Sequence, residues 1–517
     1  MSRRTKILLG LLLAALAFGL RILPGPRTID DAYITYRYAR NLLEGNGPVF
    51  NPGRPVLGTT TPLYMGLISA VALPLGGSGA PFPEIALGVN ALADALSCLL
   101  LIAVGSSLRR PAAGCAAALA WAVSPMSVTF AVGGLETSVY VLLLLSVLYC
   151  RLEEKFTAMS LLAGLAFLTR PDALILIALL WTECLVTFIR RQGWTAGIRR
   201  VFIHSLPLLA LLAGWSVFAA FYYGALLPHS LLAKSVAYRL DAGSALIRLI
   251  QHFGTPFFEH LTFGTGILII TAPLYLFLSL AGIVSAIKMR PGSGAAAGLA
   301  FPWAYFAAFS AANPLIFRWY LAPPLPFLQL TIFLGMEALL GQPEPRPKSP
   351  PRIRRILFGA LAAGAALLSL RDWTLTPDHG PNRPAPGMAY IELELLYRRV
   401  AEDIGSRLAP GSTVAAGDVG VLGYWLDVPI LDTVGLNSPE AVPYFPLPAS
   451  MYATIYAIPP ELVFSSQPDW LVFLDVYGRN GLLMDPRFAD AYRLCGEYPI
   501  QLYGSRAMLV YCRKGPP

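Results

Sequence analysis

The chain begins with MSRRTKILLGLLLAALAFGLRIL, residues 1–23, and this stretch decides how the rest of the sequence is interpreted. Residues 1–6 are basic, and residues 7–23 are apolar apart from Arg21. No pair of small residues suited to cleavage follows, so we expect a retained signal anchor rather than a cleaved signal peptide. The anchor is therefore predicted to leave residues 1–6 on the cytoplasmic side and residue 24 onward outside.

The whole chain has the composition of a membrane protein. Of its 517 residues 56% are hydrophobic and only 13% are charged, about half the charged share of soluble domains. Its mean hydropathy is +0.59. This composition disfavours a soluble globular protein, a disordered regulator and a nucleic-acid reader, although the net charge is +9. The six cysteines are too few for a disulfide scaffold, and they form no CxxC or Cys/His cluster that would suggest zinc.

Stretches long enough to cross a hydrocarbon core of about 30 Å recur along the chain. After residues 7–23 they lie near 86–108, 112–132, 137–150, 157–169, 171–189, 202–223, 264–287, 298–312, 319–340 and 355–371. The apolar segment 62–75 is ambiguous. If it does not span, the cytoplasmic side collects residues 1–6 and five later basic clusters, near 109–110, 151–155, 190–200, 288–290 and 346–355. We therefore expect segment 62–75 to be a re-entrant or interfacial helix, which gives about eleven transmembrane helices with the N-terminus inside and the C-terminus outside.

Residues 372–517 change character, because charged residues, prolines and tyrosines are dispersed among short apolar runs. Residues 388–408 have the periodicity of an amphipathic helix, and the runs 413–416, 470–474 and 508–512 predict strands. We expect an extracytoplasmic α/β domain after a transmembrane domain of residues 1–371, whose first outer loop is 24–85. Cys495 and Cys512 would face each other across a terminal hairpin that turns near residues 503–505. A disulfide and two buried free thiols are both compatible with that placement.

Two adjacent acids open the first outer loop. Residues 28–41, TIDDAYITYRYARN, have helical periodicity, with Asp30 and Asp31 in the first turn and Thr28 placed to cap it. Such acids either cap a juxtamembrane helix, which contributes about 1 kcal/mol, or form part of a reaction site. The residues themselves leave both alternatives open.

This stretch and several later ones resemble one enzyme family. DDAYITYRYARNLLEGNGPVFNPG, residues 30–53, is similar to the first outer loop of the GT-C glycosyltransferases. The likeness is to the actinobacterial terminal arabinofuranosyltransferase group in particular, which is related to aminoarabinose transferases and protein O-mannosyltransferases. Further similar pieces follow in order: GLET at 134–137, LTRPD at 168–172, YYGALLPHSLLAK at 222–234, RWYLAP at 318–323, GDVG at 417–420 and VPILDTVGLN at 428–437.

The resemblance implies a polytopic α-helical membrane enzyme that moves a monosaccharide from a polyprenyl-phosphate carrier to an acceptor, with inversion. In that family an aspartate at the start of the first outer loop is the general base, because a carboxylate must take the proton of the acceptor hydroxyl. Asp30 matches this position. Asp31 is the second choice, or an orienting partner that raises the proton affinity of the pair through like-charge repulsion.

The departing lipid phosphate would need cations at the outer membrane face. The predicted topology places four there, in descending order of preference Arg318, Lys234, Arg37 and Arg170. Arg318 ranks first because RWYLAP resembles the Arg-Tyr-Leu-x-Pro element of the family. For each of them the alternative is a snorkelling side chain at the end of a span. For Arg170 an ion pair with Asp172 is a further alternative.

Four more residues are candidates for contacts with the sugar or the acceptor: Glu136, Tyr33, His229 and Tyr320. Glu136 could instead cap the next helix, and the aromatic residues could belong to an interfacial belt. His229 stands where relatives often carry asparagine. With His252 and His260 it would suggest a metal, but the spacing fits no ligand pair on one helix, so no metal site is predicted. No cofactor is predicted either, although a divalent cation is compatible with the expected chemistry.

Neither a GxxxxGK[ST] loop nor a GxGxxG motif after a strand is present, which disfavours a nucleotide-sugar donor. The expected partners are a polyprenyl-phosphate sugar, an envelope glycan, lipid or protein acceptor and the lipid bilayer of a bacterial inner or plasma membrane, but no nucleic acid. The main alternative is a transporter or flippase of lipid-linked saccharides. It would need the same basic contacts, but neither the acid pair nor a large outer domain. A glycan sensor is disfavoured because no cytoplasmic domain would receive its signal.

Overall fold

The computed structural model describes residues 3–341, 352–374 and 383–515, so part of the basic cluster near 346–355 lies outside the described residues. The described chain forms two compact units. The first is built from Met1–Arg27, Pro83–Gly214 and Ala242–Tyr390, and the second from Thr28–Phe82, Trp215–Asp241 and Ile391–Pro517. The first outer loop thus groups with the C-terminal residues. The boundary predicted at residue 371 divides the linear sequence, whereas each of these two units combines segments from both sides of it.

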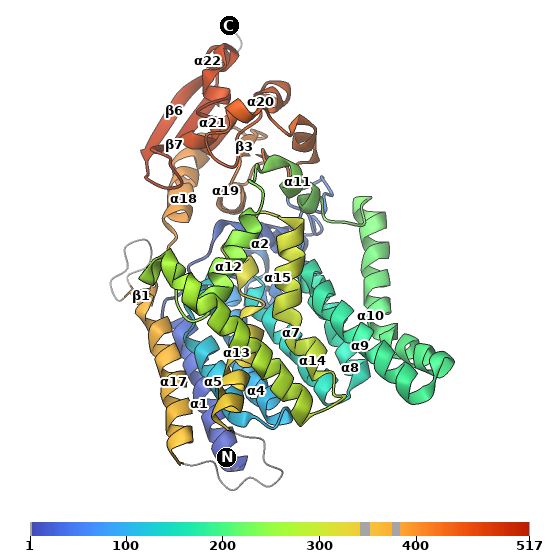
Figure 1. Cartoon of the computed structure of the whole chain (residues 1–517). Helices are drawn as coiled ribbons and strands as arrows, with labels where there is room; N and C mark the ends of the chain where they lie inside the picture. Colours follow the sequence, from blue (N-terminus) through green and yellow to red (C-terminus); the bar gives the residue numbers. More distant parts are fainter. Residues whose placement is uncertain (1–2, 342–351, 375–382, 516–517) are drawn as a thin grey trace. The chain divides into compact units, whose positions relative to one another are not determined.

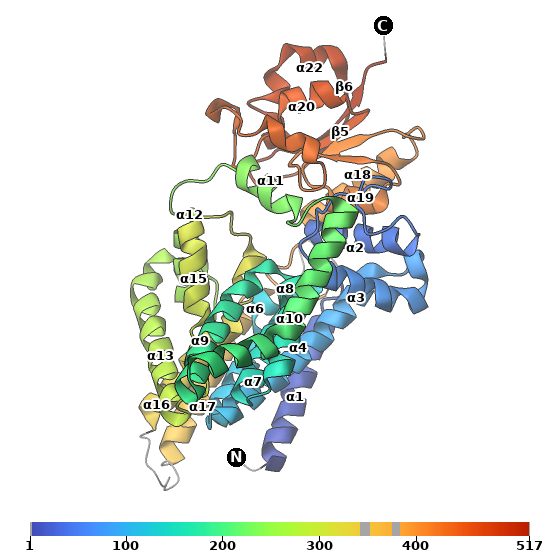
Figure 2. The same cartoon turned by 90° about the vertical axis from the view of Figure 1, so that its right-hand side faces the viewer.

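The first unit is a bundle of apolar helices (Figure 1, Figure 2). The bundle contains α1 (Arg3–Ile22), α4 (Phe82–Ser107), α5 (Pro111–Val123), α6 (Pro125–Val132), α7 (Thr137–Leu152), α8 (Phe156–Thr169), α9 (Leu174–Gln192), most of α10 (Trp194–Tyr223), α12 (Ser244–Gly254), α13 (Leu268–Met289), α14 (Ala295–Leu299), α15 (Phe301–Ala312), α16 (Leu325–Leu340) and α17 (Arg352–Arg371). Helices α13 and α16 pack closely because Gly282 and Gly335 lie at their crossing, where a Cβ on either would overlap the backbone of the other helix.

Every predicted span contains a helix, but the helices differ in length. Within the described residues, seven are long and apolar enough to cross a membrane, and α5 with α6 would make an eighth if this pair, bent by 52°, is one span. The helices α7, α8 and α15 have only 16, 14 and 12 residues. The count of eleven and the predicted orientation therefore stay predictions. Segment 62–75 forms the short apolar helices α3 (Pro62–Ala72) and η1 (Leu73–Leu75), and its interfacial position stays a prediction too.

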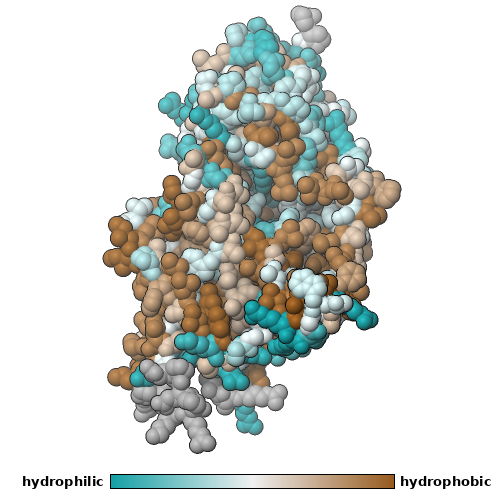
Figure 3. Space-filling view, turned by 45° about the vertical axis from the view of Figure 1, so that its right-hand side comes forward, coloured by the Kyte–Doolittle hydropathy of each residue, from teal (hydrophilic) through white to brown (hydrophobic). Residues whose placement is uncertain are grey.

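On the face that Figure 3 shows, most of the surface of the bundle is hydrophobic. On α13, for example, Ile269 is 81% exposed and Phe277 is 57% exposed. Water would make such a surface unfavourable, whereas lipid chains match it, so exposed apolar residues over whole helices mark a surface that faces a bilayer. The first unit is accordingly the membrane part of a multi-pass protein.

The second unit contains a five-stranded sheet in the order β4-β3-β5-β7-β6. The strands are β3 (Val414–Ala416), β4 (Ile430–Asp432), β5 (Trp470–Leu474), β6 (Tyr492–Pro499) and β7 (Ala507–Arg513). The first three in this spatial order are parallel, whereas β7 runs antiparallel to both β5 and β6. The predicted strands, the predicted terminal hairpin and the amphipathic helix, α18 (Glu392–Gly405), are confirmed. A disulfide joins Cys495 on β6 to Cys512 on β7.

Helix α2 (Asp30–Leu43), from the first outer loop, belongs to this second unit and packs on α19 (Gly420–Trp425), as Figure 2 shows. Aromatic rings fill the contact, with Tyr33 5.0 Å and Tyr36 6.2 Å from the ring of Tyr424. The prediction that Thr28 caps α2 is wrong. The residue at the cap position is Ile29, whose side chain cannot accept a hydrogen bond, so α2 has no side-chain cap.

Candidate functional site

The carboxylate of Asp30 is bound by the backbone at the start of α19. Its Oδ2 accepts the N–H of Gly420 at 2.9 Å, and its Oδ1 accepts the N–H of Val421 at 2.8 Å. These are free donors, because the first N–H groups of a helix have no partner within the helix. Asp30 therefore caps a helix almost 400 residues further along the chain.

Two further acids from the C-terminal part of the chain surround Asp30. Glu394, in the first turn of α18, accepts the backbone N–H of Asp30 at 3.3 Å. Asp418 precedes α19 and accepts the hydroxyl of Tyr397 at 2.9 Å. Burial raises the pKa of Asp418 to about 6 and the pKa of Glu394 to about 7. Burial, together with the negative charge of Asp418, also raises the pKa of Asp30 well above its usual value.

Asp31 differs from Asp30 in its contacts. Its side chain is half-buried, and within the described part of the chain it has no hydrogen bond or ion pair. Its carboxylate is consequently the member of the pair whose oxygen atoms remain available to a ligand.

The structure gives Arg37 a structural position. The side chain is 5% exposed and donates to the carbonyls of Phe50 at 2.6 Å, Val428 at 2.9 Å and Gly423, and to Asn51 at 3.1 Å. Because these acceptors occupy its donors, the prediction that Arg37 binds phosphate is not supported, and we leave it out of the proposed site. Tyr33 likewise lies in the aromatic contact with α19, where burial raises its pKa to about 12.

Two other predicted residues lie on α11 (His229–Ala237), also in the second unit. The backbone N–H of His229 donates to the carbonyl of Leu57 at 2.7 Å, while its buried Nε2 has no partner in the described parts of the chain. Burial lowers the pKa of His229, so this imidazole favours the neutral form. Lys234 is half-buried one turn further along the same helix.

In the first unit, three predicted residues that are far apart in sequence come together. The guanidinium of Arg170, only 4% exposed, pairs with Asp172 at 2.9 Å and with Glu136 at 3.3 Å. It also lies 4.6 Å from the ring of Tyr320. The alternative of an ion pair with Asp172 is thus confirmed. A guanidinium shared by two carboxylates is poorly suited to bind an anion, so we also leave Arg170 out of the phosphate site.

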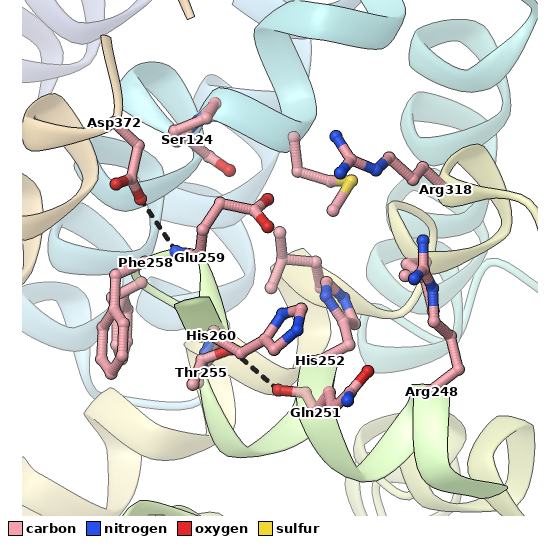
Figure 4. A pocket seen from close by; sticks show the side chains of 16 residues that line it. Ser124, Arg248, Gln251, His252, Thr255, Phe258, Glu259, His260, Arg318 and Asp372 are labelled. Atoms are coloured by element: carbon pink, nitrogen blue, oxygen red, sulfur yellow. Dashed lines mark hydrogen bonds between the residues drawn. The ribbon is translucent and has the colours of Figure 1, made fainter. Parts of the chain in front are cut away.

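Arg318 lies in η6 (Arg318–Leu321) and lines a pocket of the first unit with Arg248 of α12 (Figure 4). Both side chains are half-buried, and among the described residues neither has a hydrogen bond or an ion pair. Burial and the positive charge of Arg318 lower the pKa of Arg248. Two unpaired guanidiniums that repel each other form a site suited to an anion, and phosphate oxygens are their usual partners.

Other polar side chains complete this pocket, whose volume is about 50 Å³. His252 and His260 point into it beside the carboxylate of Glu259 (Figure 4). The Nε2 of His252 is buried and has no hydrogen-bond partner among the residues that the structure describes, and burial lowers the pKa of His252 to about 4. Asp372 is occupied, since it accepts the backbone N–H of Glu259 at 2.8 Å and the hydroxyl of Thr262 at 3.0 Å. Across the described chain, no group of three or more His, Cys, Asp or Glu side chains is arranged to hold a metal ion.

Sequence reasoning missed Arg248, Glu394 and Asp418. Arg248 lies on a short amphipathic helix, where a basic residue is usually solvated, so nothing local distinguishes it. Glu394 and Asp418 stand among other dispersed charges of the tail. Asp418 belongs to the GDVG motif, so the resemblance of that motif was the one available signal for a position next to α2.

Comparison with known proteins gives partial matches in sequence. Residues 389–511 match a protein family described as a domain of unknown function, DUF8728. A terminal beta-(1->2)-arabinofuranosyltransferase of Mycobacterium tuberculosis is 29% identical over 252 residues, and one of Corynebacterium glutamicum is 27% identical over 236 residues. These alignments cover 44% and 40% of this chain but only 38% and 33% of the relatives.

Solved structures are similar over nearly the whole chain. The Archaeoglobus fulgidus oligosaccharyltransferase has a TM-score of 0.59 at 13% identity, over 98% of this chain and 74% of its own. ArnT from Cupriavidus metallidurans, solved with undecaprenyl phosphate, has a TM-score of 0.51 at 15% identity, over 98% of both chains. Arabinofuranosyltransferase AftD from Mycobacteria has a TM-score of 0.51 at 15% identity, over all of this chain and 40% of its own.

The three solved structures share this fold although their chains differ in length. The chain therefore shares its fold with these solved structures, and both of its partial sequence matches are to terminal arabinofuranosyltransferases.

Proposed function

We propose that this chain is a glycosyltransferase that moves a monosaccharide from a polyprenyl-phosphate donor to a glycan, lipid or protein acceptor of the cell envelope. The observation that carries the proposal is the pair Arg318 and Arg248, two half-buried cations without an anionic partner among the described residues. ArnT, a structural neighbour, was solved with undecaprenyl phosphate, and an archaeal oligosaccharyltransferase with a dolichol-phosphate. A lipid phosphate therefore supplies the charge that this pocket lacks.

The acid pair of α2 supplies the base. Asp31, whose oxygen atoms are available, takes the proton of the acceptor hydroxyl as its oxygen attacks the anomeric carbon of the donor. The bond between that carbon and the phosphate oxygen breaks, and its electron pair leaves with the polyprenyl phosphate. Cations must neutralise the additional negative charge on this leaving group, and within the first unit Arg318 and Arg248 are the candidates for that role. Attack opposite to the leaving group inverts the anomeric centre.

Asp30 has a different role in this proposal, which revises the order that the resemblance implied. Its carboxylate holds the start of α19 through the backbone N–H groups of Gly420 and Val421. His229 and Lys234 remain candidates for contacts with the sugar or the phosphate, since the Nε2 of His229 is unpartnered. Glu136 and Tyr320 contact Arg170, so we assign them no direct contact with the sugar or the acceptor.

The proposed location is the bacterial inner or plasma membrane, with the acid pair and the C-terminal sheet on the outer face. The positive-inside pattern of the loops supports this orientation. Reporter fusions after α17 and after residue 515 would test it.

The deciding experiment is a radiolabelled transfer assay with a panel of polyprenyl-phosphate sugars and the full chain in detergent or liposomes. The proposed enzyme function is supported if the wild-type chain transfers at least one sugar and Asp31→Asn loses this transfer while it still binds undecaprenyl phosphate. A chain that instead moves lipid-linked saccharides across liposomes, with Asp31→Asn unimpaired, would be a flippase.

A further inference from the structure

The wall of the arginine pocket contains a broken helix. α5 and α6 bend by 52° at residues 123–125, and Ser124, Pro125 and Met126 line the pocket. Pro125 has no N–H, so the carbonyl of Trp121 loses its helical donor, and the bend separates the next carbonyls from theirs. Inside a membrane such carbonyls need donors from the protein, because lipid supplies none.

Arg21 of α1 supplies most of these donors. The guanidinium is fully buried, and all five of its N–H groups have acceptors. Its Nε donates to Asp94 of α4 at 2.9 Å. The four terminal N–H groups donate to the carbonyls of Ala17 (3.2 Å), Trp121 (3.2 Å) and Ala122 and to the hydroxyl of Ser127. Two of the three carbonyls before the break are therefore held by one side chain.

The remaining partners close the network. Asp94 also accepts the indole N–H of Trp121 at 3.1 Å and the hydroxyl of Ser138 at 3.0 Å, and its side chain is fully buried. The carbonyl of Val123 accepts the indole N–H of Trp373 at 3.2 Å. A buried polar network in which every member is satisfied permits one arrangement of its helices, since each displacement leaves a charged or polar group unpaired.

We infer that Arg21 and Asp94 are positioning residues for the pocket of Arg318 and Arg248. They fix the break between α5 and α6, and through it the wall at residues 124–126 that faces the bound phosphate. This inference rests on the proposed function in naming phosphate as the ligand. The mechanical part, control of the wall by the ion pair, stands on the hydrogen bonds alone.

A second buried ion pair in the same unit offers a matched control. Arg151 and Glu183 lie 2.7 Å apart with side chains 1% and 19% exposed. Neither residue lines the arginine pocket. Loss of either pair should lower thermal stability, but only the pair of Arg21 and Asp94 should affect the pocket.

The test combines binding of undecaprenyl phosphate with methyl NMR of the methionines, in which the Met126 signal is assigned from Met126→Leu. In the wild-type chain the lipid phosphate should shift the Met126 resonance. Arg21→Lys cannot reach all five acceptors, so it should move that resonance without ligand, weaken binding about tenfold and raise KM more than it lowers kcat. Arg151→Lys should lower Tm but leave the resonance, the affinity and KM unchanged.

If Arg21→Lys does not fold, Asp94→Asn and the milder Ser127→Ala, which removes one acceptor, take its place and should show the same effects in graded form. Variants that keep the wild-type Met126 resonance and affinity would overturn the inference. A third outcome separates the two claims. If the Met126 resonance moves in the variants but the wild-type chain binds no undecaprenyl phosphate, the positioning role stands and the proposed function is refuted.

Discussion

Gly420 donates its backbone N–H to the carboxylate of Asp30 over 2.9 Å, and the two residues approach so closely that a Cβ on Gly420 would overlap the main chain of Asp30. Gly420→Ala should therefore force α19 away from α2. We expect a loss of about 1–3 kcal/mol of stability, as for other overpacked contacts, together with reduced transfer activity. Thermal melts and the radiolabelled assay measure the two effects.

Gly405→Ala is the control for this substitution. A Cβ at Gly405 would make ordinary contact with Leu426 at 3.7 Å, so stability and activity should stay close to those of the wild-type chain. Equal behaviour of the two alanine variants would show that the close approach at Gly420 does not matter.

The two acids of α2 should respond differently to neutralisation. Asp31→Asn should lower kcat by at least about 100-fold, the usual contribution of a general base, without changing Tm. Asp30→Asn should lower Tm as well as activity, because an amide is a weaker acceptor for the N–H groups of Gly420 and Val421. The opposite pattern, full activity in Asp31→Asn and an inactive but stable Asp30→Asn, would return the role of base to Asp30.

The acid cluster should make stability depend on pH. The pKa of Glu394 is raised to about 7 and that of Asp418 to about 6. Between the unfolded and folded pKa values the folded chain binds more protons than the unfolded chain, so stability should fall as the pH rises from about 4 to about 7. Glu394→Gln should be more stable than the wild-type chain at pH 8, by an amount on the order of 1 kcal/mol after allowance for solvent screening, and equal to it near pH 4. Melting curves across this range compare the two, and a wild-type Tm that rises with pH relative to Glu394→Gln would contradict the assignment.

The two arginine sites of the first unit should separate stability from function. Arg248→Met removes one of two cations that repel each other, so it should raise Tm while it weakens binding of undecaprenyl phosphate. Arg170→Met leaves two buried carboxylates without their cation and should lose about 3–5 kcal/mol of stability. A titration calorimeter and thermal melts give both quantities. Unchanged affinity in Arg248→Met would remove this arginine from the site.

The disulfide of the terminal hairpin should stabilise the second unit. It closes a loop of 17 residues between Cys495 and Cys512, for which the chain-entropy account gives about 3 kcal/mol. The double variant Cys495→Ser/Cys512→Ser should melt lower by a corresponding amount, and reductant should then have no further effect. The buried cysteines Cys98 and Cys184 are unpaired, so their serine variants control for loss of a thiol alone.

Local patterns predicted the elements well where one physical signal dominated. Apolar length located a helix in each predicted span, and short apolar runs located β3, β5 and β7. Length alone does not decide whether a short helix such as α15, with 12 residues, crosses the membrane, because a broken helix and a short span have the same hydropathy. The strand β4, Ile430–Asp432, was missed because it follows Pro429 and ends in an aspartate, so its two apolar residues form no run like that of β3.

The candidate site was less accessible to sequence reasoning, because its contacts join distant parts of the chain. Arg37 and Arg318 look alike in sequence, yet the first is surrounded by carbonyl oxygens and the second has no partner in the described structure. Which arginine is unpaired depends on where Gly423 and Val428 are placed by the fold. The sequence pattern therefore predicts which residue types are candidates, whereas the hydrogen-bond partners in the fold decide which arginine is available to a phosphate.

The attachment of α2 to α19 also bears on the order of synthesis. Asp30 leaves the ribosome early, whereas Gly420 follows it by 390 residues and the Arg37 acceptor Val428 lies 391 residues beyond that arginine. Until these late segments emerge, the acid pair has no rigid support, and truncated chains that reach the membrane would carry every transmembrane helix without an ordered base. Under the proposed function, transfer should therefore require the segment that contains Gly420 and Val428, because this segment holds the first outer helix through Asp30 and Arg37.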